Sequence, residues 1–231
     1  MNAILRLCAA AVISVLLATQ AQAAGLADIS NKDAAAGLKE ALTKGAQTAV
    51  AQLGKQDGFL KNERVRIPLP DSLHKVEGMM RGLGMGKYAD ELVTTMNRAA
   101  ESAVVEAKPL LVNAVKNLSV QDAKGILGGG QDAATQFFKR TTAAPLTEKF
   151  LPIVAKATQK VKLADKYNEF AGKGAKFGLV DAQDADLNRY VTRKALDGLY
   201  LMIAEEEKKI RQDPLGAASG IVRKVFGAIG K

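Results

Sequence analysis

Few side chains in this sequence are of the types that perform catalysis or bind metal ions. The 231 residues include one histidine, His74, and one cysteine, Cys8. A serine or cysteine triad needs a histidine, and a zinc site usually needs several histidine or cysteine ligands. The sequence therefore predicts no metal site and no cofactor, and it predicts His74 to be a surface residue. Any hydrolysis would have to rely on carboxylates.

Two sites with acidic residues are candidates, one for hydrolysis and one for binding calcium. Glu101-Ser102 is similar to the catalytic glutamate-serine pair of lytic transglycosylases, but the Gly-Leu-Met-Gln stretch and the aromatic-rich sugar cleft of that family are missing. The acidic cluster between Asp181 and Asn188 lacks the glycine and the final glutamate of a calcium-binding loop. Helix capping explains this cluster better, because acids favour the first turn of a helix.

A charged pair is a third candidate. Arg193 and Asp197 are four residues apart on a mostly apolar helix, so both are expected on one side of it. A charge in a buried helix needs a partner, and each of these residues can serve the other. We interpret the pair as structural, and a polar pocket around it is the alternative.

A row of lysines is the fourth candidate. A helix is predicted to begin near Pro145, and Lys149, Lys156 and Lys160 align on one stripe beside its apolar residues. The stripe could bind an anion. We interpret it as a solvated flank, because an amphipathic helix must place some polar residues next to its apolar stripe.

Helices must position nearly all of these residues, because no stretch alternates apolar and polar residues as a strand does. Apolar spacing and capping residues predict helices over residues 31–54, 71–81 and 87–108, the last kinked or restarted at Pro109. Prolines hold the segment 58–70 in a non-helical conformation. Ser119 is predicted to cap a short helix that ends at three glycines.

The carboxyl-terminal part of the chain contains the most apolar helix. Residues from Leu187 to Ile203 are apolar nearly all round, which predicts a central, buried helix. Glu205 to Arg211 is predicted to be its solvated end, with two pairs four residues apart, Glu205 with Lys209 and Glu207 with Arg211. A last helix, Pro214 to Lys231, is predicted to pack against the bundle rather than to lie on a membrane.

Two segments of the sequence resemble each other. Apolar residues, prolines and glycines of 109–129 match those of 152–172 at an offset of 43 residues. Two similar helical hairpins would produce this match. They could be a duplication or two ordinary amphipathic hairpins.

The amino terminus has the pattern of a secretion signal. Arg6 precedes an apolar run from Leu7 to Ala18, and Ala21-Gln22-Ala23 follows it. This pattern predicts a signal peptide over residues 1–23 with cleavage after Ala23. The remainder, 24–231, is predicted to be one all-α domain, a compact multi-helix bundle in the periplasm. No later segment is long and apolar enough for a transmembrane helix.

The charge of the chain narrows the choice of partner. The chain has 33 Lys and Arg against 24 Asp and Glu, a net charge of +9. For an exported protein this excess favours anionic components of the cell envelope, such as lipid headgroups, over nucleic acid. The simpler interpretation is solubility, because a moderate net charge is common on soluble surfaces.

Four strings of the sequence resemble one bacterial family. They are Tyr190 to Arg211, Arg66 to Pro70, Met96 to Glu101 and Asp122 to Leu127. With them the chain resembles the domain of unknown function 4197 (DUF4197) family over nearly all of its mature length. The resemblance implies a Gram-negative envelope protein, and it implies no activity, substrate or catalytic residue.

Two functions remain open at this point. The first is a non-catalytic periplasmic helical protein that binds a partner or an anionic envelope component. The alternative is a carboxylate-dependent hydrolase acting on cell-wall or lipid material. A deep pocket with two facing carboxylates would favour the enzyme, and a shallow basic surface would favour binding.

Overall fold

The structure, a computed structural model, describes residues 31–176, 181, 184–213 and 220. These residues contain helices and no β-strand, which confirms the all-α prediction. None of the helices in this part of the chain is long and apolar enough to cross a membrane. The helices are α2 (Asn31–Leu53), α3 (Asp71–Gly82), α4 (Gly86–Val104), α5 (Ala107–Lys116), α6 (Val120–Leu127), α7 (Ala133–Thr158), α8 (Lys162–Lys176) and α9 (Leu187–Gln212). The predicted signal peptide, and all but Gly220 of the helix predicted over 214–231, lie outside the described residues.

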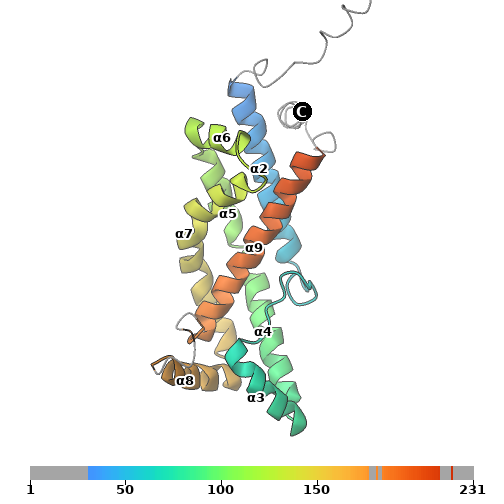
Figure 1. Cartoon of the computed structure of the whole chain (residues 1–231), viewed down its shortest axis with the longest axis vertical. Coiled ribbons are helices and arrows are strands. Elements are labelled where there is room, and N and C mark those ends of the chain that lie inside the picture. Colours follow the sequence, from blue (N-terminus) through green and yellow to red (C-terminus); the bar gives the residue numbers. More distant parts are fainter. Residues whose placement is uncertain (1–30, 177–180, 182–183, 214–219, 221–231) are drawn as a thin grey trace, which may run out of the picture.

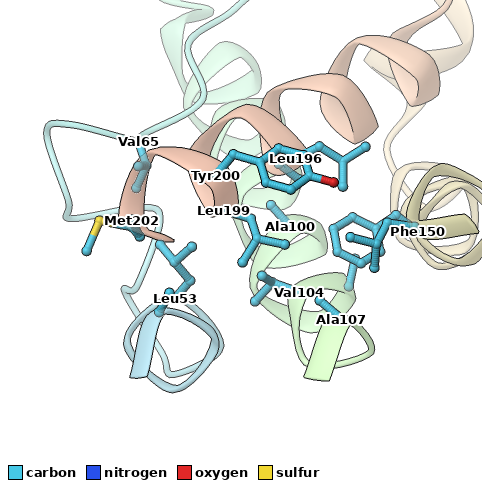
Figure 2. Packing of buried hydrophobic residues seen from close by; sticks show 14 of the residues in the cluster. Leu53, Val65, Ala100, Val104, Ala107, Phe150, Leu196, Leu199, Tyr200 and Met202 are labelled. Atoms are coloured by element: carbon cyan, nitrogen blue, oxygen red, sulfur yellow. The ribbon is translucent and has the colours of Figure 1, made fainter. Parts of the chain in front are cut away.

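Helix α9 forms the centre of the bundle, as its apolar sequence predicted. It runs diagonally along the molecule and packs against α2, α4 and α7 (Figure 1). Val191 and Leu199 are fully buried. Leu199 points towards Ala100 and Val104 of α4 (Figure 2). Since α9 has buried residues on several sides, it joins the other helices into one core.

The connector between α2 and α3 is not helical, as predicted, and α4 fixes its path. Asn97 of α4 is fully buried, and its amide oxygen accepts a hydrogen bond from the backbone N–H of Ile67 at 2.8 Å. Its amide nitrogen donates to the carbonyl oxygens of Ile67 and Val93, at 2.9 and 2.8 Å. One side chain thus replaces the backbone partners that an extended segment would find in a sheet.

The connector also lies directly against α9. A Cβ atom at Gly198 would come within 2.8 Å of Phe59 Cε1 and 3.2 Å of Val65 Cβ. Phe59 is fully buried in this contact. Gly198 is therefore the point at which the absence of a side chain allows the connector to reach the central helix.

Helix α7 differs from its prediction. It begins at Ala133, not near Pro145, and continues through Pro145 and Pro152 to Thr158. A proline inside a helix removes one backbone donor and normally weakens or kinks it. Here Phe137 and Phe138, both buried, anchor the first half of the helix in the core. Tertiary packing therefore keeps this segment helical despite its two prolines.

The break expected at Pro109 also lies elsewhere. Helix α4 ends at Val104 and α5 begins at Ala107, so Pro109 falls in the first turn of α5. A proline is well tolerated there, because the first backbone N–H groups of a helix have no partner within the helix.

The two matching segments have the same order of elements, a helix, a short turn and a second helix. These are α5 and α6 in the first segment, and the end of α7 with α8 in the second. Equivalent positions share their burial: Leu111 and Val154 are both fully buried, and Leu118 and Val161 are both buried beside the turn. The match at an offset of 43 residues therefore corresponds to a shared order of elements and a shared burial pattern.

Candidate functional site: a groove between α7 and α9

A groove of about 750 Å³ lies between α7 and α9. The two helices are antiparallel: Thr142 near the start of α7 shares a hydrogen bond with Tyr200, and Thr158 at its end donates to Asn188 near the start of α9. The walls of this α7–α9 groove are formed by Lys139, Ala143, Thr147, Glu148, Leu151, Arg189, Thr192, Arg193, Leu196, Asp197 and Tyr200.

The spacing of these residues makes the groove elongated. Ala143, Thr147 and Leu151 are four residues apart and form one stripe of α7. On α9 the lining runs from Arg189 to Tyr200, a distance of about 16 Å along the helix axis. The groove therefore suits an extended ligand better than a compact one.

Two polar atoms in the wall have no hydrogen-bond partner among the described residues. They are the hydroxyl oxygen of Thr192 and Nε of Arg193, and both atoms are buried. Thr192 is only 2 % exposed. A buried polar group without a partner is costly, so native structures usually supply one from the protein, from water or from a ligand.

Arg193 has a different partner from the one predicted. Its Nη2 forms a salt bridge with Asp184, in the loop before α9, and not with Asp197. Asp197 is exposed and lines the groove beside Arg193. The prediction of a buried Arg193–Asp197 pair was wrong because helical spacing considers only partners on the same helix. Both residues line the same groove, together with apolar side chains such as Leu151 and Leu196.

The other charges of the groove are mixed. Lys139 and Arg189 are basic and exposed, and Glu148 is an exposed acid. The ammonium group of Lys139 lies 5.9 Å from the centre of the Tyr200 ring. Burial raises the pKa of the Tyr200 phenol, so this hydroxyl stays protonated in the groove wall.

The predicted lysine stripe is not part of this groove. Lys149 and Lys156 are exposed on α7, Lys160 is exposed in the turn that follows the helix, and none of the three belongs to the groove wall. The sequence pattern continued the helix to Lys160, two residues past its end at Thr158, and it could not show which side of α7 faces a cavity.

Glu101 is a structural residue. Its side chain is 6 % exposed, and its Oε1 accepts hydrogen bonds from the backbone N–H groups of Phe59 and Leu60, both at 3.1 Å. Its Oε2 is 2.7 Å from Nη1 of Arg98. A carboxylate with both oxygens engaged in this way holds the connector against α4, and it lines none of the cavities described for this chain.

Glu207 is a second buried carboxylate, and the sequence analysis assigned it wrongly to a solvated helix end. It accepts hydrogen bonds from the backbone N–H groups of Ala134 and Thr135, at 3.0 and 2.9 Å, and therefore caps α7 from another helix. Its predicted salt bridge with Arg211 is present at 2.9 Å. The pair was visible in the sequence, but its burial was not. The pair predicted between Glu205 and Lys209 was wrong, because Lys209 pairs with Glu206 and Arg64 pairs with Glu205.

The remaining candidates behave as predicted or as ordinary surface residues. Asp186 caps α9 by accepting hydrogen bonds from the backbone N–H groups of Asn188 and Arg189. Ser119 caps α6 in the same way. His74 is half-exposed on α3, near Asp71. Within the described residues no three His, Cys, Asp or Glu side chains gather as metal ligands would.

A family model described as "Protein of unknown function (DUF4197)" matches residues 28–227. No curated protein and no solved structure matches the chain.

Proposed function

Because the chain belongs to the DUF4197 family, whose function is unknown, we propose a role for it from its own geometry. The protein is a non-catalytic, periplasmic binding protein that holds an anionic component of the cell envelope in the α7–α9 groove. The observation that carries this proposal is the pair of buried, unpartnered atoms in the groove wall, Thr192 Oγ1 and Arg193 Nε. Both can donate a hydrogen bond, and arginine carries a fixed positive charge.

The groove has the size of a ligand site. Its volume of about 750 Å³ falls within the range of roughly 300 to 1,000 Å³ that is usual for small-molecule pockets. The signal peptide expected at the amino terminus and the net charge of +9 support an anionic ligand outside the cytoplasm.

A hydrolase remains the second candidate, because two carboxylates, Glu148 and Asp197, line the same groove. Both side chains are exposed. A carboxyl group that acts as general acid is usually surrounded by apolar side chains, which raise its pKa towards neutrality. Neither residue has such surroundings, so binding is the better-supported function.

Native mass spectrometry of the protein purified from its own periplasm tests the proposal. We expect a bound, intact small molecule in the wild type and its loss in Ala143→Trp, which fills the groove. The matched control is Ala155→Trp, at a half-buried position of α7 outside the groove wall, and it should retain the molecule.

Two results would contradict binding in this groove: a wild type that carries no ligand, or a ligand that survives Ala143→Trp. Glu148→Gln and Asp197→Asn address the hydrolase. If either variant accumulates a molecule that the wild type carries only in cleaved form, the groove is an active site.

A further inference from the structure

We infer that the ligand of the α7–α9 groove is a single-chain amphiphile with one anionic head group. This inference rests on the proposed function, and it names the chemical class of the ligand. The head group lies at the Arg193 end of the groove, and the alkyl chain extends along it towards Tyr200.

The polar end of the groove is set by neighbouring residues of α9. Asp184 holds Nη2 of Arg193, while Nε of the same guanidinium stays buried and unpartnered. Thr192 adds a second unpartnered donor, and Arg189 adds a second positive charge one turn earlier. Two donors beside a cationic guanidinium fit an acceptor with several oxygens and a negative charge, such as a carboxylate or a phosphate.

The rest of the groove fits an apolar chain. Ala143 and Leu151 of α7 line it together with Leu196 and the Tyr200 ring of α9. Leu196 and Tyr200 are themselves buried, so the groove reaches into the apolar interior. A small inorganic anion would occupy the polar end and leave this apolar length unfilled.

The charge pattern argues against a polyanion. Glu148 and Asp197 stand among the basic residues of the groove wall. A chain of phosphates laid along the groove would meet these carboxylates and be repelled. A ligand with a single negative charge, held at Arg193 and Thr192, meets less of this repulsion than a polyanion.

Isothermal titration of ligand-free, full-length mature protein tests this inference with four probes. They are dodecanoate, a one-chain lysophosphatidylglycerol, dodecyl maltoside and inorganic phosphate. We expect both anionic amphiphiles to bind about tenfold or more tightly than the neutral maltoside, because a hydrogen bond to a charged group contributes at least this much. Phosphate alone should not bind measurably. The tighter of the two anions identifies the source as a free fatty acid or a phospholipid.

Thr192→Val provides the critical variant, because it keeps the shape of the side chain and removes the donor. Affinity for both anions should fall about tenfold, while the melting temperature stays the same or rises, since the hydroxyl has no partner in the described fold. The matched control is Thr158→Val. Its hydroxyl bonds to the Val154 carbonyl and to Asn188, so the melting temperature should fall without a change in affinity.

The inference is overturned if the maltoside binds as tightly as the anions, if phosphate alone binds as tightly as the amphiphiles, or if Thr192→Val leaves anion affinity unchanged. Other results distinguish a wrong ligand class from a wrong proposed function. A different ligand that co-purifies with the wild type and disappears in Ala143→Trp would refute the amphiphile and retain the binding groove. The absence of any ligand displaced by Ala143→Trp would refute both.

Discussion

At the scale of single residues, two polar side chains of one short string hold the connector in place. Asn97 bonds to the backbone of Ile67, and Glu101 bonds to the backbone of Phe59 and Leu60. Both belong to the string Met96 to Glu101 that resembles the DUF4197 family. The distinctive residues of this string therefore have a structural explanation, and no catalytic role is needed for them.

Replacing Asn97 tests this role. Asn97→Ala leaves the N–H and carbonyl of Ile67 without their side-chain partner, and each buried group left unpaired costs about 1 to 3 kcal/mol. We expect a large decrease in the free energy of unfolding, measured by urea denaturation. Asn113→Ala, at an exposed position of α5, should change it by less than about 0.5 kcal/mol. Equal effects of the two variants would show that the Asn97 bonds contribute little.

Residues whose partners are close in sequence were predictable. Ser119 and Asp186 cap helices whose first N–H groups are only two or three residues away. The partner of Arg193 was not predictable, because Asp184 lies nine residues away along the chain and outside the helix. The two unpartnered atoms of the groove could not be predicted either, since an atom lacks a partner only relative to a packed structure.

At the scale of elements, the helix boundaries that were predicted wrongly depend on contacts with residues far away along the chain. The start of α7 is fixed by Glu207, which is 72 residues away from Thr135 along the chain. Local signals in the sequence pointed instead to Pro145, a normal first-turn residue. By contrast, the central position of α9 follows from its own apolar composition, and it was predicted correctly.

The contact between α9 and the connector gives a prediction at this scale. In Gly198→Ala the new methyl group would meet Phe59 and Val65 at 2.8 and 3.2 Å, and such overpacking costs about 1 to 3 kcal/mol. The melting temperature should fall. In the control, Gly125→Ala on α6, nothing lies within 4 Å of the added Cβ, and higher helix propensity should raise the melting temperature. A neutral Gly198→Ala would mean that the connector moves away easily.

At the scale of the whole molecule, buried tyrosines make the fold sensitive to alkali. Burial raises the pKa of Tyr167, Tyr190 and Tyr200 above the usual value of 10.0, and that of Tyr190 to about 12. The folded state disfavours the phenolate, whereas the unfolded chain ionises freely. Stability is therefore fully present below about pH 10, and the tyrosine contribution is lost as the pH rises towards about 12.

Thermal melts between pH 9 and pH 12, a window of roughly the span of these pKa values, test this effect. We expect the melting temperature of the wild type to fall more steeply with pH than that of Tyr190→Phe. The variant loses a hydrogen bond to the Pro68 carbonyl and starts lower at neutral pH, so the slopes are compared and not the absolute values. Parallel curves would show that Tyr190 does not contribute to the alkaline transition.

The position of α9 in the chain has a consequence for the order of folding. It is the last helix given in full by the described residues, yet α2, α4 and α7 all pack against it. Until α9 is synthesised, these helices lack the surface that Val191 and Leu199 fill, and α7 lacks the cap that Glu207 supplies. A nascent chain of this protein therefore cannot complete its core until α9 has been synthesised.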